Sequence, residues 1–459
     1  MNGHWKTGGN EEILVSNALD MTRGKPLPLL VKFGVPLMLS YILQQLYSLC
    51  DSVIVGRLIG VEAFAAVGSA SFLSALPLEM LLGLTQGFGV VLAQRFGAGD
   101  EAGLRRSALL SSGFGCVAAA LMTAMGLCFL TPLLTVLRTP TALMEMAAAY
   151  LRVMFFGLIA TALYNVAATL LRAMGDSRTP LVALVASTLL NIVLDYLLVA
   201  WGGMGVEGVA LATVLATVFA LCVCAMRLHS HPGKLPPQSG EPMRRGVGAQ
   251  LLKMGLPPMF RNGVVAVGGL YVQSVVNGFG VAFVAGMTAA RRYFTMMVMV
   301  SGALEGALAT FVGQNAGAGR TERIEAGTRT AVRLALVASI FTGICTAVFA
   351  RPLIALLVTE GNAEVVRVGV EALRVTSLLL PSLYLLCLYR ATLQSMGDAV
   401  TPTLSGFTEL ALRILCVSLL PSLIGRSAAY LADGLGWVAA MILLMGVYYW
   451  KTRAMRRVR

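Results

Sequence analysis

An acidic side chain, Asp51, lies inside a long apolar stretch that runs from Val35 to Gly56. A helix crosses a bilayer with roughly 20 apolar residues, so this stretch is long enough to span a membrane. A carboxylate at membrane depth costs about 2.5–3.5 kcal/mol on insertion scales, and such groups usually mark the path of an ion or substrate. Gln44 and Tyr47 precede Asp51 at helical spacing and fall on the same face. The alternative is an acid that reaches the membrane surface from the end of its helix.

The composition is that of a protein built within a membrane. Of the 459 residues, 57% are hydrophobic and only 12% are charged, which indicates a polytopic membrane protein rather than a soluble domain. The apolar runs predict an all-α fold with twelve transmembrane helices. We expect these spans at residues 30–57, 63–92, 105–130, 143–171, 179–201, 205–228, 250–277, 283–312, 328–350, 366–393, 402–421 and 428–450.

Histidine is missing from these spans, and cysteine occurs there without the spacing of a metal site. The three histidines, His4, His229 and His231, all lie outside them. The eight cysteines lie in apolar runs without a Cys-x-x-Cys pair, so we expect them to pack as small hydrophobic side chains. This inventory excludes a histidine-based active site or metal cluster inside the membrane.

The basic residues indicate how the spans are oriented. The net charge is +13, and Lys and Arg concentrate in the loops after even-numbered spans and in the C-terminal tail, for example at Arg105, Arg172, Arg244 and Arg457. Because basic loops stay on the cytoplasmic side, we expect both termini in the cytoplasm and a multi-pass protein of the cell inner (cytoplasmic) membrane. The same distribution favours membrane lipids as partners and argues against nucleic acid.

The second half of the chain repeats the first. Three segments recur in the same order, at nearly constant offsets of 220 to 222 residues. The pairs are 93–100 with 313–320, 32–36 with 253–257, and 174–176 with 396–398. This regularity indicates a duplication in which each half contributes six spans.

An even number of spans in each half means that both halves insert the same way up. The fold is therefore expected to contain two six-helix lobes related by a pseudo-twofold axis along the membrane normal, with the substrate site near the midplane at or beside their interface. The expected limits are 1–26 for a cytoplasmic N-terminal segment, 27–228 for the N-lobe, 229–249 for a cytoplasmic linker, 250–450 for the C-lobe and 451–459 for a basic tail.

These motifs resemble those of the MATE family, the multidrug and toxic compound extrusion transporters. The likeness spans about Leu27 to Trp450 and rests on residues 33–36, on residues 51–57, on two Gln-x-x-Gly-Ala-Gly segments and on two Met-Gly-Asp…Thr-Pro segments. The first half looks most like the prokaryotic branch related to the DNA-damage-inducible F proteins. The resemblance implies a monomeric secondary active antiporter, not an enzyme, with no cofactor. Such an antiporter exports small amphipathic and often cationic compounds in exchange for H+ or Na+ by alternating access.

Polar side chains in the first half match the cation site of that branch. Asn191 and Asp195 are four residues apart and share a helical face. In the related branch this pair is joined by an Asp of the first span, which Asp51 matches. A Thr of the sixth span completes the site, and Thr213 matches that position. We expect Asn165 of the fourth span to support the set from behind.

The chemistry of such a set agrees with ion coupling. Two carboxyl groups in one water-poor pocket repel each other, so one of them can hold a proton near neutral pH. The same oxygens, with amide and hydroxyl oxygens beside them, also suit a hard cation such as Na+. The choice between H+ and Na+ stays open at this point. The alternative interpretation is a polar packing cluster that hydrogen-bonds across the lobe.

The predicted substrate cavity combines polar and adaptable apolar side chains. Methionines can adapt to varied apolar ligands, although ordinary core or lipid-facing methionines have the same pattern. Pro36 removes a helical hydrogen bond about 22 Å from Asp51, and we expect it to act as a hinge of the first span. The predicted cavity residues are Gln44, Tyr47, Thr217, Met296, Met297 and Met299.

The second half is expected to lack an equivalent cation site. The counterpart of Asp195 in the repeat is Val417. Glu409 and Arg413 are four residues apart on span eleven and form either an intramembrane ion pair or part of the coupling machinery. Glu305 on span eight is a weaker candidate for a coupling role.

Two other classes of function are alternatives to the antiporter. A lipid-linked precursor flippase belongs to the same broader superfamily, but such proteins usually carry extra spans and a strongly cationic cavity. A membrane-embedded enzyme or a receptor is a further alternative, but the predicted spans hold no catalytic grouping, and the duplicated halves fit alternating access better.

Overall fold

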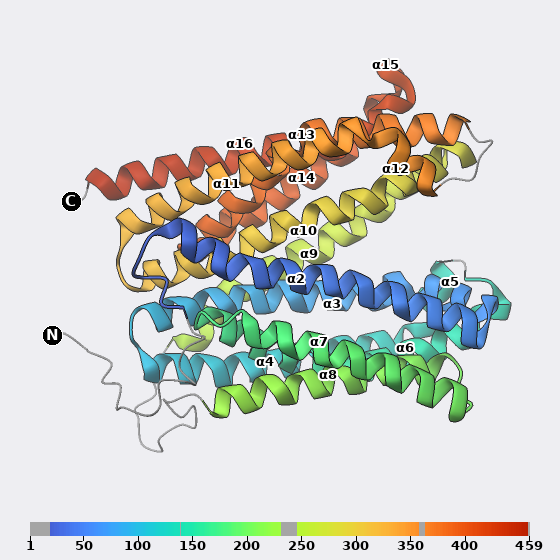
Figure 1. Ribbon diagram of the computed structural model, residues 1–459, viewed down its shortest axis with the longest axis horizontal. Helices are drawn as coiled ribbons and strands as arrows, with labels where there is room; N and C mark the ends of the chain where they lie inside the picture. Colours follow the sequence, from blue (N-terminus) through green and yellow to red (C-terminus); the bar gives the residue numbers. More distant parts are fainter. Residues whose placement is uncertain (1–18, 138, 231–245, 358–362, 458–459) are drawn as a thin grey trace.

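The computed structural model describes residues 19–137, 139–230, 246–357 and 363–457. Within these ranges the chain is helical and forms no strand, and twelve of its helices have 18 residues or more (Figure 1). This architecture confirms the predicted all-α fold.

The long helices form two bundles (Figure 1). The first contains α2 (Pro26–Ile54), α3 (Val61–Gly97), α4 (Glu101–Cys128), α6 (Thr141–Ala173), α7 (Arg178–Asp195) and α8 (Val206–His229). The second contains α9 (Val247–Asn277), α10 (Val281–Gly317), α11 (Thr321–Val348), α13 (Ala363–Ser395), α14 (Val400–Leu419) and α16 (Ala428–Arg457). The shorter elements are α5 (Leu130–Val136), α12 (Ala350–Leu357), α15 (Pro421–Ile424), the 3₁₀ turn η3 (Gly425–Ser427) and the π-helical segments η1 (Val55–Ile59) and η2 (Tyr196–Trp201).

Eleven stretches of the described chain are long and apolar enough to cross a membrane. The twelfth long helix, α9, contains Lys253 and Arg261, and it packs against α3 of the first bundle and α14 of its own. Several helices run past the predicted spans. For example, α3 continues to Gly97 before Gly99, with a φ of 69°, turns the chain.

Some of the predicted segments include residues that the structure does not describe. Residues 1–18 of the predicted N-terminal segment and 231–245 of the predicted linker lie outside the described residues, so the lobe limits stay predictions. The predicted tail at 451–459 begins as helix, because α16 continues to Arg457.

Duplicated motifs meet at one end of the molecule, which we call the terminal end because α2 begins and α16 ends there. Gln94 Nε2 donates to the Ser395 carbonyl at 2.9 Å. Its counterpart in the repeat, Gln314, donates through Nε2 to the Ala173 carbonyl, also at 2.9 Å. Exchanging the two halves of the chain converts one contact into the other, as a pseudo-twofold axis requires.

Glycine allows α3 and α10 to cross in direct backbone contact at this point. A Cβ atom at Gly97 would collide with the Gln314 carbonyl, and one at Gly317 would collide with the Gln94 carbonyl. The Gln-x-x-Gly segments therefore seal the two bundles together at the terminal end.

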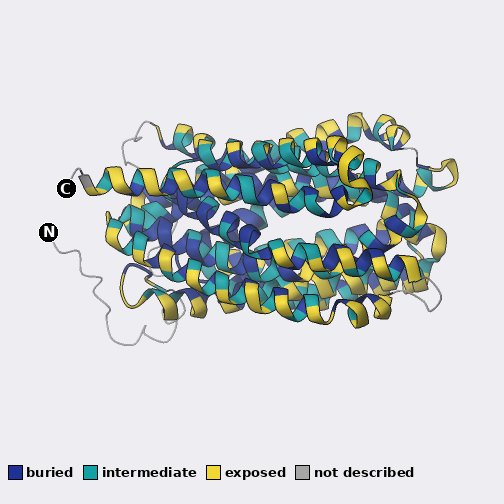
Figure 2. Cartoon of the chain, turned by 90° about the horizontal axis from the view of Figure 1, so that it is seen from above, coloured by how far each residue is buried: buried dark blue, intermediate teal, exposed yellow. Residues whose placement is uncertain are grey.

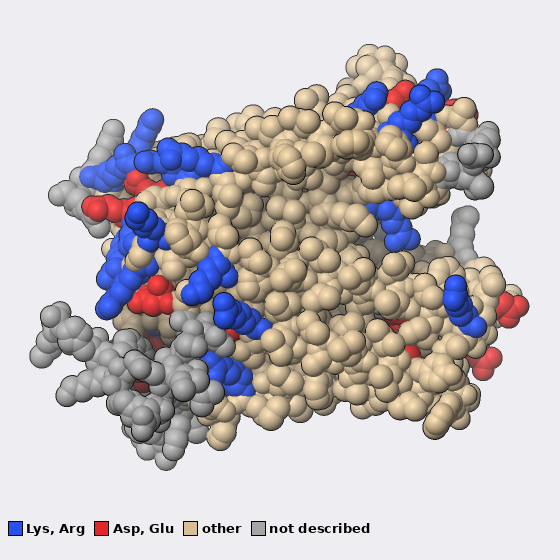
Figure 3. Space-filling model, viewed as in Figure 1, with Lys and Arg blue, Asp and Glu red and all other residues tan. Residues whose placement is uncertain are grey.

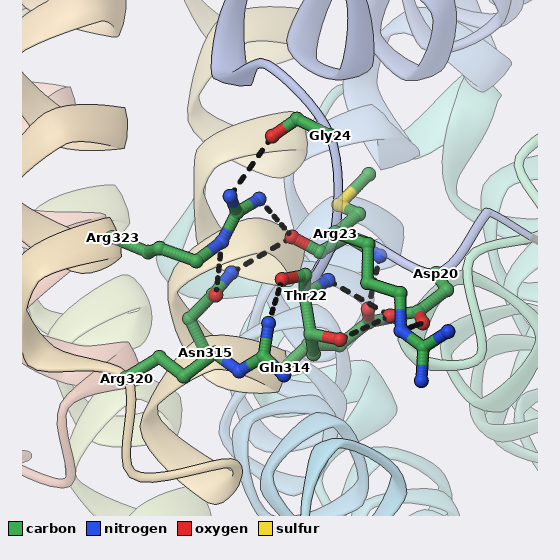
Figure 4. Close-up of polar contacts among 9 residues, drawn as sticks. Asp20, Thr22, Arg23, Gly24, Gln314, Asn315, Arg320 and Arg323 are labelled. Carbon is green, nitrogen blue, oxygen red and sulfur yellow. Dashed lines mark hydrogen bonds and ion pairs between the residues drawn. The ribbon is translucent and has the colours of Figure 1, made fainter. Parts of the chain in front are cut away.

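A short segment, residues 19–24, lies across this seal, and we call it the latch (Figure 4). Met21 within it is fully buried. The Met21 N–H donates to Gln314 Oε1 at 2.8 Å, and the Met21 carbonyl accepts from Asn315 Nδ2 at 3.0 Å. Arg323 donates to the same carbonyl through Nη2 at 3.0 Å and to the Gly24 carbonyl through Nη1 at 2.9 Å.

The latch makes one further contact with each bundle. The Leu19 N–H donates to the Gly175 carbonyl in the turn between α6 and α7 at 3.1 Å. Arg320, at the start of α11, donates to the Thr22 carbonyl. One short segment thus joins the two bundles through charge-assisted and backbone hydrogen bonds.

The two bundles separate toward the opposite end, which we call the distal end. Buried residues gather between the bundles near the terminal end (Figure 2), and the ribbons of the two bundles diverge toward the distal end (Figure 1). In the space-filling view the surface is hollowed between the bundles at the distal end, and many of the Lys and Arg side chains of this face lie at the terminal end (Figure 3). The molecule is closed at the terminal end and open at the distal end.

Candidate functional site

Two acids of the first bundle lie where a helix changes its winding. Asp51 lies on the last turn of α2, and Asp195 is the last residue of α7. The chain beyond each is π-helical, in η1 and η2, and π-helical turns are frequent at functional sites. At the first junction the Val55 N–H is shared between the carbonyls of Asp51 and Ser52. In the described chain, α9 and α14, the equivalent helices of the second bundle, carry no such segment.

The carboxyl groups of Asp51 and Asp195 lie in hydrogen-bonding contact, although they come from different helices. Asp195 and Asn191 are fully buried. The Oδ1 atom of each acid is shielded and has no hydrogen-bond donor among the described residues. Asn191 bridges its neighbours when its amide nitrogen lies 3.2 Å from Asp195 Oδ2 and its oxygen lies 3.2 Å from the Thr213 backbone nitrogen.

A tyrosine of α2 reaches across to α8 beside this pair. The Tyr47 hydroxyl lies 3.0 Å from Thr213 Oγ1. Since the Thr213 hydroxyl donates to the Val209 carbonyl at 3.1 Å, Tyr47 is the donor in the first contact. Asp51, Asn191, Asp195 and Thr213 therefore occupy one site, and Tyr47 closes one side of it.

A further tyrosine was missed by the sequence analysis. Tyr150 on α6 is buried and lies within electrostatic range of both Asp51 and Asp195. The only signal in the sequence was a tyrosine within an apolar span, and many tyrosines at membrane interfaces share that pattern.

The arrangement needs a positive partner to be stable. Two ionised carboxyl groups in contact repel each other, so the pair favours a state in which a proton or a cation lies between them. Among the described residues no cluster of three or more His, Cys, Asp or Glu side chains is present. A metal cation held here would draw its remaining oxygen ligands from Asn191 and Thr213, which suits a weakly held monovalent ion better than a tightly bound transition metal.

Comparison with known proteins decides the family. The family model described as MatE matches residues 36–197 and 257–419, one stretch in each half of the chain.

The chain belongs to the MatE family.

Individual relatives agree with this assignment. The chain is similar to the probable multidrug resistance protein YpnP of Bacillus subtilis (strain 168), with 32% identity over 67% of this chain and 69% of that protein. It is also similar to DNA damage-inducible protein F of Escherichia coli (strain K12), with 28% identity over 50% of each chain. Its fold matches a crystal structure of MATE in the bent conformation with a TM-score of 0.88 and 23% identity, over 95% of this chain and 98% of that one. The predicted family, its prokaryotic relatives and a transporter rather than an enzyme are confirmed.

Four other residues predicted for the site of this MatE protein have no hydrogen bond to the carboxyl pair among the described residues. Asn165 is buried on α6, but none of the hydrogen bonds among described residues joins it to the pair. Gln44 is exposed on α2, and Thr217 lies one turn beyond Thr213, to whose carbonyl it donates at 2.9 Å. Pro36 is buried within α2, which continues as an α-helix on both sides of it.

The three methionines lie in the second bundle of the MatE fold, on α10. Met296 is exposed, Met299 is half-buried and Met297 is buried in the hydrophobic core, where the Met297 carbonyl accepts from the Tyr384 hydroxyl at 2.7 Å. Met297 is therefore a core residue in this conformation, and only its two neighbours have partly free surfaces. Their part in substrate binding stays a prediction.

The second bundle holds its own buried charges, and Glu409 is paired with arginines. Glu409 on α14 accepts from Arg390 of α13 at 3.1 Å and from Arg413 at 2.9 Å. Arg413 also lies 2.7 Å from Asp433 of α16. Glu305 lies within electrostatic range of Arg390. The Glu409–Arg413 ion pair, one of the two alternatives expected from the spacing, is formed, and it extends to Arg390 and Asp433.

Proposed function

We propose that this MatE protein is a secondary active multidrug exporter that expels amphipathic or cationic compounds in exchange for H+ or Na+. The observation that carries the proposal is the contact between Asp51 and Asp195, two carboxyl groups without arginine or lysine partners at the junctions of two helices. The relatives described as probable multidrug resistance proteins support the substrate class. Both termini lie in the cytoplasm of an inner-membrane protein in this proposal, as the basic loops predict.

The coupling ion binds between the two acids. Asp51 and Asp195 supply the charge, and Asn191 and Thr213 supply neutral oxygens. A proton or Na+ bound there removes negative charge from the pocket that a cationic substrate would otherwise use. Because an ion or a substrate shifts the protein only by its differential affinity for two states, competition for this charge is enough to link their movements.

In this proposal, helix α2 converts ion binding at Asp51 into a movement of the bundle. Asp51 lies near its distal end, and Pro36 lies about 22 Å away along the same helix, at 1.5 Å per residue. The Pro36 nitrogen cannot donate within the helix, and the Pro36 carbonyl accepts from Ser40 Oγ at 2.9 Å. When the ion neutralises Asp51, the segment beyond Pro36 tilts, and the cavity bounded by Gln44 and Tyr47 shrinks.

Alternating access requires the terminal end to open in turn. In this conformation the Gln-x-x-Gly crossing and the latch close that end, while the distal end is open. The transition to the opposite state breaks the latch contacts made by Arg323 and Gln314. The free energy needed to break these contacts sets how strongly the outward-open state is favoured.

Flux measurements with the gradients imposed separately test the proposal. Purified protein in sealed vesicles should expel a cationic dye when either a proton gradient or a sodium gradient is imposed, and it should stop when that gradient is collapsed. The same vesicles with both gradients absent are the control. Export that continues unchanged without any ion gradient contradicts ion-coupled antiport.

A further inference from the structure

A cavity of about 260 Å³ lies in the second bundle near the terminal end, between α11, α13 and α16. Its walls are formed by three arginines, three tyrosines, two threonines, a glutamate and a valine. It is separate from the carboxyl pair, which lies in the first bundle. Nothing in the coupling mechanism uses it.

The cavity carries an excess of positive charge. Glu325 is the acid in its wall, and it forms a two-pronged ion pair with Arg456. Arg329 lies within electrostatic range of Glu325, but neither it nor Arg453 forms an ion pair with a carboxylate in the described part of the chain. Two guanidinium groups therefore remain available to an anion.

Three tyrosines add hydroxyl groups to the lining of the cavity. Tyr389 and Tyr448 are buried with ring centroids 5.3 Å apart, and Tyr448 and Tyr449 meet edge to face at 5.3 Å. The hydroxyls of Tyr389 and Tyr449 lie 3.5 Å apart. The buried Thr328 hydroxyl also borders the cavity. Guanidinium and hydroxyl donors in one hollow are the groups that bind phosphate oxygens.

The cavity lies at the level expected for lipid headgroups. The side chains of Tyr449 and Trp450 on α16 are 50% and 69% exposed, and they lie close to the point where α16 ends at Arg457. Exposed Tyr and Trp side chains near the end of a transmembrane helix mark the boundary between acyl chains and headgroups. A basic hollow between transmembrane helices at this level is typical of anionic headgroup sites.

We propose that the cavity between α11, α13 and α16 is a binding site for the phosphate-bearing headgroup of an anionic membrane lipid. The size of the cavity agrees with this ligand. At about 260 Å³ it is smaller than the roughly 300–1,000 Å³ of sites for drug-sized ligands, so it admits a headgroup but not a whole exported compound.

The first bundle shows that the fold does not need these residues. At the offset of 220 that relates α4 to α11, Thr328 and Arg329 correspond to Ala108 and Leu109. At the offset of 222 that relates α6 to α13, Tyr389 corresponds to Ala167. Equivalent helices thus pack with small or apolar residues at these three positions.

The experiment uses the purified full-length chain in detergent. The probes are dioleoyl phosphatidylglycerol, dioleoyl phosphatidylcholine and inorganic phosphate, and the readouts are the thermal unfolding temperature and retained lipid in native mass spectra. The anionic lipid should raise the unfolding temperature saturably and remain bound, whereas phosphatidylcholine and phosphate should do neither. The double variant R329Q/R453Q should weaken the apparent affinity for the anionic lipid by roughly tenfold or more.

Two further variants keep the test decisive. Arg106 lies on α4 in the first bundle near the same end, so R106Q removes a comparable charge outside the cavity and should leave lipid binding unchanged. Tyr389→Phe removes only a hydroxyl group and should weaken binding about threefold to tenfold. Equal effects of R106Q and R329Q/R453Q, equal binding of the two lipids, or a saturable effect of phosphate alone would each overturn the proposed lipid site.

Discussion

The two bundles share a fold but treat buried charge in opposite ways. In the first, Asp51 and Asp195 contact each other and have no basic partner among the described residues. In the second, the repeat replaces Asn191 and Asp195 by Arg413 and Val417, and Glu409 lies between two arginines. The two halves therefore share a helix arrangement, and in our proposal the unpaired acids of the first half are balanced by the coupling ion. An acid that already has a fixed cation has little reason to bind another.

The winding of the helices follows the same division. The π-helical segments η1 and η2 occur directly after the two acids of the first bundle, whereas α9 and α14 have none in the described ranges. π-Helical turns are rare and occur frequently at functional sites. In our proposed mechanism the first bundle therefore changes state, and the second acts as a fixed support.

The sharpest test of this division compares acid removal in the two bundles by transport. We expect Asp195→Asn to reduce gradient-driven efflux to the level of protein-free vesicles, because the amide keeps the shape but cannot carry the ion. Asp433→Asn in the second bundle removes an acid from the paired network and should retain most efflux. Both variants are measured at matched protein amounts, and active transport by Asp195→Asn would contradict the assignment.

Loss of an acid should affect the free energy of unfolding more in the second bundle than in the first. Glu409→Gln leaves Arg390 and Arg413 buried without their shared carboxylate, and we expect a loss of about 3–5 kcal/mol in the free energy of unfolding. Asp195→Asn removes repulsion from Asp51 and should leave stability unchanged or raise it. Thermal unfolding in detergent measures both. A larger loss for Asp195→Asn than for Glu409→Gln would reverse our description of the two bundles.

Substrate affinity should depend on the ion only through the first bundle. A proton or Na+ at the carboxyl pair removes the negative charge that attracts a cationic substrate, so substrate binding should weaken as pH falls or as Na+ rises. The dependence should disappear in Asp51→Asn and persist in Asp433→Asn. Binding titrations by fluorescence are suitable. A flat response in the unmodified protein to both ions would rule out competition for charge.

The latch should have a smaller effect, on the balance between the two open states. Arg323 makes charge-assisted hydrogen bonds that each contribute about 1.5–3 kcal/mol, so Arg323→Gln should shift the population toward a state that is open at the terminal end. Labelling of a cysteine introduced near Gln314 reports that opening. Arg106→Gln, which does not contact the latch, is the control, and equal labelling of both variants would remove the latch from the mechanism.

Much of the fold follows from local pattern. Apolar runs predict the helices, because a helix in a membrane must satisfy its own backbone and expose apolar side chains. The motif offsets predict two equivalent halves, and spacing places Asn191 and Asp195 on one face. The Glu409–Arg413 pair follows from the same rule. These features depend on residues close together along one helix or on a direct repeat, so the sequence by itself was sufficient.

The family resemblance predicted that Asp51, Asn191, Asp195 and Thr213 share one site, but the other contacts between helices were decided only by the tertiary structure. Periodicity assigns a residue to a face but does not say which helix that face meets. Tyr47 and Thr213 are separated by 166 positions and Met21 and Gln314 by 293, and neither contact has a local signature. The same applies to Tyr150, to Arg390 beside Glu409, and to the tyrosine-lined cavity. Packing of helices distant in the sequence selects these neighbours, because each helix settles where its small residues allow the closest approach.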